Sequence, residues 1–362
     1  MAMTTRVLRL RLKDKHAAML DELAGEVNFV WNYCNELAMK VWARERRFMS
    51  GYDFHPYTKG AGKAGLSLHS QTIQAVGEEY ASRRKQARKL KLRWRVSRGS
   101  RRSPGWVPFK RSAITYRNGQ VHFCGTPLSL WDSYGLAGYA LGAGSFSEDA
   151  RGRWYFNVSV KTVRPANSER QKCVGIDLGL KDFAGLSDGR VVEAQHFYRD
   201  LQPALAGAAR ARKKSRVRAL HAKVANRRKD FLHKLSRRLV EEHGAIFVGN
   251  VNAKALAQSR AAKSVPDAGW SAFRTMLQYR SDDAGVWFEQ VNEAYSTVTC
   301  SVCKKRTGPS GLEGLRIREW TCACGAHHQR DVNAARNILA VGRDRLAVGI
   351  PVVPALCAAA VG

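Results

Sequence analysis

The chain has 362 residues, with 61 Lys and Arg against 30 Asp and Glu, giving a formal net charge of +31 and a pI near 10.3. This length can bury a sizeable core and predicts two or three domains. A chain this basic requires a polyanionic partner, most often nucleic acid. The start lacks the apolar core of a signal peptide, and no apolar run reaches the roughly 18 residues of a membrane helix. We therefore expect a cytoplasmic protein that binds nucleic acid and no membrane.

The N-terminal half combines a strand, two helices and a β-rich region. Alternating basic and apolar residues predict a strand over residues 6–12, and apolar residues at helical spacing predict a helix over residues 16–47. A second helix is expected over residues 67–95. From residue 113 to residue 161, strands bounded by Asn-Gly and Arg-Gly turns predict the hairpins of a small β-barrel.

Two basic segments are candidates for nucleic-acid contact. Residues 83–111 hold thirteen Lys and Arg, no acid and two tryptophans, and residues 210–238 hold thirteen against the single acid Asp230, within a helical stretch over residues 204–242. Such runs are usually solvated faces, but this density and aromatic content favour contact with phosphates and stacking on bases. The residues expected to bind are Arg83, Arg84, Lys85, Arg88, Lys91, Arg93, Arg210, Lys213, Lys214, Arg216, Arg227, Arg228 and Lys234.

The C-terminal half has an α/β pattern that carries two notable acids. A β-hairpin is predicted over residues 173–192, and Asp177 lies in its apolar first strand. An acid there costs free energy unless it is paired or metal-bound. Strands over residues 245–251 and 286–295, separated by helical residues, complete an α/β core. A final amphipathic helix begins at or near Asp331, whose simplest role would be an N-cap.

Four cysteines have the spacing of a structural zinc site: Cys300, Cys303, Cys322 and Cys324. Four thiolates can close a tetrahedral Zn²⁺, with each pair supplied by a tight turn. The second pair has one intervening residue where two are usual. His327 or His328 could therefore replace a badly placed thiolate.

Five blocks together resemble the insertion-sequence OrfB/TnpB family: NFVWNYCNELA, ANRRKDFLHKLSRRLV, GIDLGLKDFAGLSDG, YSTVTCSVC and CGAHHQRDVNAARNIL. Members are compact RNA-guided endonucleases related to type V CRISPR effectors and to the eukaryotic Fanzor proteins. The resemblance covers nearly the whole chain. It implies guide RNA and target double-stranded DNA as partners, with one monomer per guide RNA.

The resemblance also implies a domain organisation. A split RuvC-like nuclease core of RNase H fold would be interrupted by a zinc ribbon and preceded by a wedge β-barrel with an inserted helical recognition domain. The expected ranges are 1–165 for the wedge domain with recognition helices at about 15–110, 170–296 for the first part of the core with basic helices at 204–242, 297–327 for the ribbon, 328–345 for the last part of the core, and 346–362 for a flexible tail.

By position in the resemblance, Asp177 matches the first RuvC acid and Asp331 the last. With a third carboxylate they would hold two Mg²⁺ ions for phosphodiester hydrolysis. Most relatives place a Glu at the end of the strand that matches residues 245–251. This chain has Gly249 and Asn250 there, and two carboxylates alone hold two ions poorly.

A relocated glutamate resolves this difficulty. Fanzor proteins and TnpB proteins of serine-recombinase-associated elements carry the Glu on the strand that leads into the ribbon, where this chain has Glu293. Glu289 shares the same strand face by alternation but lies further from the strand exit. We therefore expect a magnesium-dependent DNA endonuclease with Asp177, Glu293 and Asp331 as ligands. The alternatives are a nuclease-inactive RNA-guided repressor and a zinc-ribbon DNA-binding accessory of a transposon.

Four further residues are candidates for substrate contact. Arg330 could contact the scissile phosphate or pair with a carboxylate. Gln71, Thr72 and Gln74 match a region that in relatives lies beside the target-adjacent motif. Gln side chains can read base edges, although a polar helix face is the simpler explanation of this pattern.

Overall fold

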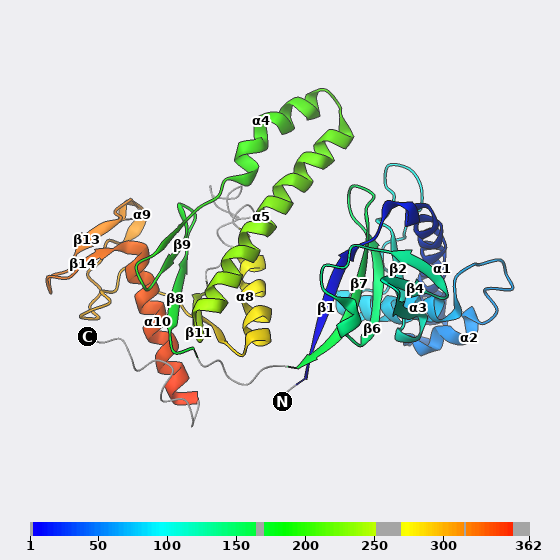
Figure 1. Cartoon of the computed structure of the whole chain (residues 1–362), viewed down its shortest axis with the longest axis horizontal. Helices are drawn as coiled ribbons and strands as arrows, with labels where there is room; N and C mark the ends of the chain where they lie inside the picture. The colour runs from blue at the N-terminus through cyan, green and yellow to red at the C-terminus, as the bar shows by residue number, and fades with distance from the viewer. Residues whose placement is uncertain (1–2, 164–169, 251–268, 315, 350–362) are drawn as a thin grey trace. The chain divides into compact units, whose positions relative to one another are not determined.

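The computed structural model describes residues 3–163, 170–250, 269–314 and 316–349 (Figure 1). The chain divides into two compact units, residues 3–162 and a unit that begins at Val163. Within the described ranges, no helix is long and apolar enough to cross a membrane.

The first unit contains two sheets. One has the order β1-β7-β6-β2, formed by Met3–Arg11, Trp154–Val163, Leu141–Glu148 and Trp106–Phe109; the other is β3-β4-β5, formed by Ile114–Arg117, Gln120–Phe123 and Thr126–Ser129. A bridge between Leu12 and Leu130 joins them. The hairpins predicted at the Asn-Gly and Arg-Gly turns are confirmed as β3–β4 and β6–β7. Asn118 and Gly119 both have positive φ, as a tight two-residue hairpin loop requires.

The two sheets share one aromatic core. Phe109 of β2 contacts Phe123, Phe146 and Phe156 with ring centroids 5.1–6.3 Å apart, and all four rings are buried. Aromatic rings bury large apolar areas, so this cluster holds the short strands together.

Helices α1 (Ala17–Glu45), α2 (His55–Thr58) and α3 (Ser70–Ala87) complete the first unit. The helix predicted over residues 67–95 was placed too long, because α3 ends at Ala87 and Arg88 adopts a left-handed conformation with φ of 50°. The residues beyond it are held extended by side chains of α1.

Asparagines spaced along α1 bind this extended segment like a neighbouring strand. The side-chain amide of Asn35 donates to the carbonyl of Leu92 at 2.9 Å and accepts from its N–H at 3.1 Å. Asn32 makes the same two bonds to Arg95, at 2.9 and 2.8 Å. The NFVWNYCN pattern puts these amides on one helix face, since residues three and four apart are neighbours on a helix. Tertiary contact with α1 therefore overrides helix propensity after Ala87.

Replacing Asn35 with Ala should destabilise the first unit by about 2–3 kcal/mol, because buried polar groups lose their partners. Asn35 is fully buried and also accepts the Tyr80 hydroxyl at 2.9 Å. Urea denaturation followed by tryptophan fluorescence measures the change. Glu36→Ala, which removes only an exposed ion pair with Lys40, is the matched control and should change stability by less than about 0.5 kcal/mol. Equal stability of the two variants would contradict the role of Asn35.

The second unit is built on a five-stranded sheet with the order β10-β9-β8-β11-β12. Its strands are β8 (Cys173–Leu178), β9 (Asp182–Leu186), β10 (Val191–Glu193), β11 (Ala245–Gly249) and β12 (Trp287–Val291). The first three are antiparallel, whereas β8, β11 and β12 are parallel. The predicted α/β core and its first hairpin are confirmed.

Helices α5 (Lys214–Glu242) and α8 (Trp270–Ala284) cover one face of this sheet, and α10 (Arg330–Gly349) covers the other. Helix α4 (Phe197–Arg210) packs on α5. Ile246 and Val248 of β11 pack in one core with residues of α5 and α8, whereas Ala245 and Phe247 pack with Ile338 of α10. The helical stretch expected over residues 204–242 forms two helices, of which the first begins earlier, at Phe197. Helices α4 and α5 make a hairpin that extends beyond the sheet (Figure 1).

A small ribbon lies between β12 and α10 in the chain. It contains α9 (Gly311–Gly314) and the hairpin of β13 (Glu319–Thr321) and β14 (His327–Gln329), which leads directly into α10. Figure 1 shows α10 lying along β8, in agreement with the contacts between them. Helix α10 continues to Gly349 and so includes the first residues of the expected tail. The remaining tail, residues 350–362, lies outside the described residues.

Candidate functional site

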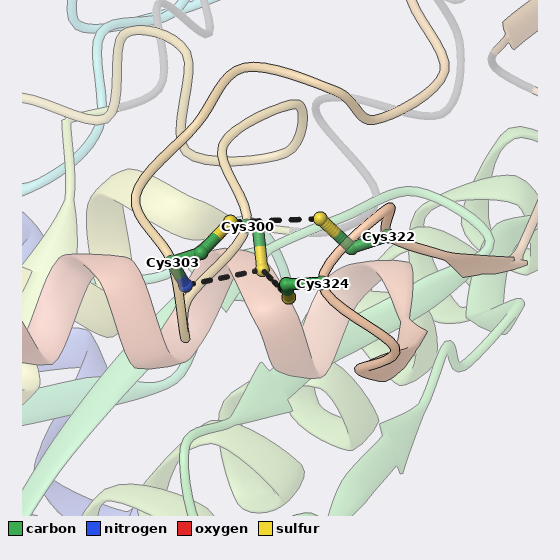
Figure 2. A group of neighbouring side chains, drawn as sticks. All are labelled: Cys300, Cys303, Cys322 and Cys324. Atoms are coloured by element: carbon green, nitrogen blue, oxygen red, sulfur yellow. Dashed lines mark hydrogen bonds between the residues drawn. The ribbon is translucent and has the colours of Figure 1, made fainter.

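The four predicted zinc ligands converge in the ribbon. Cys300 and Cys303 come from the turn after β12, and Cys322 and Cys324 come from the turn between β13 and β14 (Figure 2). Their sulfur atoms lie within 4.8 Å of one another, with Cys300–Cys324 at 3.8 Å and Cys303–Cys322 at 3.6 Å. A tetrahedral Zn²⁺ with Zn–S bonds of about 2.3 Å needs sulfurs about 3.8 Å apart. The residues therefore fit one zinc ion.

Neither histidine is needed to replace a thiolate. His327 contacts the Thr321 hydroxyl through Nδ1 at 3.1 Å and lies on the exposed side of β14. His328 is buried, with Nε2 3.1 Å from the Cys300 sulfur. Burial lowers the pKa of His328, so the neutral ring can donate to a thiolate and orient it.

The surroundings of the second cysteine pair favour the thiolate at Cys322 only. The Ala326 N–H lowers the pKa of Cys324, but the Cys322 side chain and then burial outweigh it and raise that pKa to about 11. The backbone N–H of Cys324 and then the Thr307 hydroxyl, 3.1 Å away, lower the pKa of Cys322 to about 6. A turn closed by the N–H of Gly325 on the Cys322 carbonyl at 2.9 Å brings the pair together. Gly325 has a φ of 88°, which glycine adopts without strain.

The three predicted acids meet on the α10 face of the second-unit sheet. Asp177 is buried in β8, and its pKa is raised well above the usual range, first by burial and then by the negative charges of Glu293 and Asp331. Arg330 and Arg318 oppose this rise in pKa. Three carboxylates from a strand, a loop and a helix therefore interact electrostatically.

Glu293 lies over the glycine where relatives were expected to carry their acid. A Cβ built on Gly249 would overlap the Glu293 Oε2 atom and lie 3.1 Å from Ile338 Cδ1. Asn250 fixes this end of β12: its N–H donates to the Val291 carbonyl at 3.0 Å, and its Oδ1 accepts the Glu293 N–H at 3.3 Å. The carboxylate of Glu293 thus takes the space that a side chain at position 249 would use.

Glu289, the second candidate, is directed elsewhere. Its carboxylate pairs with Arg345 of α10 at 3.0 Å. Arg345 lies fourteen residues after Asp331, roughly 20 Å along the helix axis. Glu289 is therefore distant from the acidic site.

Asp331 is not the N-cap of α10. The Gln329 side chain accepts the Val332 N–H at 2.6 Å and caps the helix. The Asp331 carboxylate instead accepts hydrogen bonds from the Arg318 guanidinium, whose Nη1 lies 3.2 Å from each carboxylate oxygen. The backbone of Asp331 packs on Gly185, which pairs with Asp177 in the sheet. This packing places Asp331 of α10 next to Asp177, on the face of the sheet that α10 covers.

The two arginines near Asp331 occupy different positions. Arg330 is buried and donates to the carbonyl of Gly314 in the ribbon. Arg318, which precedes β13, is the arginine at the Asp331 carboxylate. Sequence reasoning missed Arg318 because it lies in an irregular segment without a periodic or motif signal.

Most of the predicted nucleic-acid contacts are exposed, but Arg84 is not. Its guanidinium is buried, donates to the Met49 carbonyl at 2.7 Å and lies 4.8 Å from the Phe48 ring. Arg84 therefore stabilises the first unit, and the prediction for it was wrong. The other residues predicted to bind nucleic acid in this segment are exposed: Arg83, Lys85, Arg88, Lys91 and Arg93.

Most of the predicted nucleic-acid contacts in the second unit are also exposed, and one of them is partly buried. Arg228 is half-buried, and its aliphatic stem packs beside Gly269. Asp230 pairs with Lys234 at 2.8 Å, an exposed contact that leaves the lysine at the surface. Of the residues predicted to bind nucleic acid in this unit, the exposed ones are Arg210, Lys213, Lys214, Arg216, Arg227 and Lys234.

Of the three residues predicted to read the target-adjacent motif, one is buried and two are partly exposed. Thr72 is fully buried, so it cannot reach a base edge and that prediction was wrong. Gln71 and Gln74 are half-exposed and contact Ser112 and Lys110 through their side-chain oxygens. Their amide nitrogens are the groups that could reach a ligand.

Two family profiles match the chain. One, described as "Probable transposase" of the OrfB_IS605 type, matches residues 155–260, and the other, "Cas12f1-like, TNB domain", matches residues 270–338. A Streptomyces pristinaespiralis protein named "Putative RNA-guided DNA endonuclease" is 31% identical over 93% of this chain and 88% of its own length. "Putative RNA-guided DNA endonuclease InsQ" of Escherichia coli (strain K12) is 28% identical over 55% of this chain and 56% of its length.

A solved structure has the same fold. The cryo-EM structure described as the "Cas12f1-sgRNA-target DNA complex" contains a chain that matches with a TM-score of 0.60, covering 93% of this chain and 98% of that one. The sequences are 10% identical. The similarity is therefore one of fold.

Replacing Asp177 with Asn should stabilise the metal-free protein at neutral and higher pH. The raised pKa means that folding disfavours the charged carboxylate, and a tenfold change in its acid dissociation constant corresponds to about 1.4 kcal/mol of stability. Below about pH 3 the acid is protonated in both folded and unfolded chains, so the two proteins should melt alike. The melting temperature of the variant in EDTA should exceed that of wild type increasingly as the pH rises, by about 3 °C or more at pH 8.

Asp188→Asn is the control for this measurement. Partial burial acts to raise the pKa of Asp188, but hydrogen bonds from Arg190 outweigh it and lower the pKa, so Asn should not stabilise the protein there. An Asp177→Asn protein that melts at or below the wild-type temperature at pH 8 would contradict the electrostatic account of the site.

Proposed function

The chain belongs to the OrfB/TnpB family, and we propose that it is a transposon-encoded RNA-guided DNA endonuclease. The names of the curated relatives support this activity. The observation that carries the proposal is the convergence of Asp177, Glu293 and Asp331 on one sheet face. A protein that only binds nucleic acid has no use for three mutually repelling carboxylates in a buried position.

The order of the elements supports a RuvC-like core of RNase H type. Three antiparallel strands are followed by two parallel ones, and the first strand carries Asp177. The last helix carries Asp331 and follows the ribbon. The ribbon would be a structural zinc module, in which four thiolates hold one ion and fix the hairpin that leads into α10.

The acidic site would hold two Mg²⁺ ions, which phosphodiester hydrolysis at a site of several carboxylates uses as a pair about 3.5–4 Å apart. Bound ions would activate a water and stabilise the leaving oxygen of a phosphodiester.

The side chains of the protein have distinct tasks in this account. Asp177, Glu293 and Asp331 would hold the ions, which explains why they are kept together despite their repulsion. Arg318 keeps the Asp331 carboxylate oriented before an ion arrives. Asn250 fixes the backbone of Glu293 at the end of β12.

Exposed cations in both units would bind guide RNA and target DNA. Positive residues along α5 and after α3 offer phosphate contacts, and the exposed Trp94 offers a ring for stacking. Gln71 and Gln74, beside Lys110 and Ser112, remain candidates for reading the target-adjacent motif. The repressor alternative is less favoured because all three acids are present and interact.

Glu293→Gln should reduce cleavage at least about 100-fold, since a neutral amide is a poor ligand for a hard cation. Glu289→Gln is the matched control, because Glu289 lies four residues earlier in the chain and pairs with Arg345 instead, and it should stay within about twofold of wild type. Single-turnover cleavage of target DNA by the protein purified with its co-expressed transposon-end RNA measures both. Target binding should be unchanged in either variant.

Other outcomes separate the competing functions. Wild type that binds its target in Mg²⁺ without cutting would favour the repressor. A protein that co-purifies with no specific RNA would favour a transposon accessory. If Glu293→Gln cut at the wild-type rate, Glu293 would not be a metal ligand, but the protein would still be a nuclease.

A further inference from the structure

Helix α10 carries two buried asparagines that neither metal site uses. Asn333 is 1% exposed and Asn337 is 8% exposed. They are four residues apart and therefore lie on the same helix face. A buried amide costs free energy unless its donors and acceptor are paired, so their partners indicate what they do.

Both amides bind the same two carbonyls. Asn337 Nδ2 donates to the Ser296 carbonyl at 2.9 Å and to the Thr299 carbonyl at 2.6 Å. Asn333 Nδ2 donates to the same atoms at 3.3 and 2.8 Å, and its Oδ1 accepts the Ser301 N–H at 2.9 Å. Two side chains thus clamp one short turn against α10.

The clamped turn joins the two candidate metal sites. Its first bond runs from the Ser296 N–H to the Glu293 carbonyl at 3.0 Å. Its last residue, Thr299, precedes the zinc ligand Cys300. The clamp therefore holds the segment that connects the third carboxylate to the first thiolate.

The sheet cannot hold this segment by itself. Strand β12 ends at Val291, so Glu293 lies beyond the strand pairing. Tyr295 has a φ of 63°, and the turn bonds mainly to itself, as in the Thr299 N–H to Tyr295 carbonyl contact at 3.0 Å. A non-glycine residue in this conformation persists only when its surroundings enforce it.

We propose that Asn333 and Asn337 are positioning residues for the nuclease reaction. By holding the turn against the helix that bears Asp331, they set the separation of the Glu293 and Asp331 carboxylates. This inference rests on the proposed function, in which those carboxylates hold the ions. Metal sites lose activity when ligands are displaced by about 0.5 Å or more. A turn that is held less firmly should therefore weaken ion binding even though all three carboxylates remain.

The decisive variants are Asn337→Ala and Asn337→Leu. Leu keeps the branched skeleton of Asn, with larger methyl groups and no donor, so a packing role predicts that Leu retains more activity than Ala. A hydrogen-bonding role predicts that Leu fails as Ala does, because the Ser296 and Thr299 carbonyls lose a donor in both. Ser236→Ala, a buried polar change in α5, controls for general loss of stability.

Three quantities are measured on the protein–RNA complex: the Mg²⁺ concentration for half-maximal cleavage, the Kd for target DNA, and the zinc content. Both Asn337 variants should need about 10-fold more Mg²⁺, the usual effect of losing a residue that orients a ligand. Target Kd should stay within about twofold, with one zinc per chain. Hydrogen exchange in a peptide spanning residues 293–301 should become faster in both variants and stay unchanged in Ser236→Ala.

Three results would overturn the inference: a wild-type Mg²⁺ requirement in Asn337→Leu, loss of zinc together with activity, or unchanged exchange in the peptide. Failure of wild type itself to cut, with the exchange result as expected, would instead refute the proposed function. The clamp would then be a structural feature of the ribbon alone.

Discussion

The close approach of α10 to the sheet is the constraint on which the second unit depends. A Cβ at Gly175 would overlap the Ala335 carbonyl oxygen, and one at Gly185 would lie 2.8 Å from the carbonyl carbon of Asp331. Any larger residue at these positions would push the helix away from the sheet. Because Asp177 lies on the sheet and Asp331 on the helix, this contact between backbone surfaces brings the two carboxylates together.

The same constraint explains how Glu293, which follows the end of β12, reaches this face of the sheet. Position 249 lies on the helix-facing side of β11, and as a glycine it leaves its space to the Glu293 carboxylate. Burial, and then the negative charges of Glu293 and Asp331, raise the pKa of Asp177, so the metal-free fold gives up stability at this point. Functional sites commonly carry such a cost, which a bound cation would offset.

Local patterns predicted much of this arrangement. Turn residues located the hairpins, and cysteine spacing located the four-cysteine cluster that fits a zinc ion. Features that depend on contacts between distant segments were out of reach. The burial of Thr72 and Arg84 follows from packing that a basic or polar pattern does not reveal, and Arg318 reaches Asp331 only because the ribbon folds back on α10.

The most direct test moves the carboxylate from Glu293 to position 249. Glu293→Ala should abolish cleavage, and Gly249→Glu alone should also impair it, because the new side chain would overlap the Glu293 carboxylate. The double variant Gly249→Glu with Glu293→Ala should recover cleavage to within about 10-fold of wild type. A double variant that folds and binds its target but cuts no better than Glu293→Ala would contradict the shared position of the two side chains.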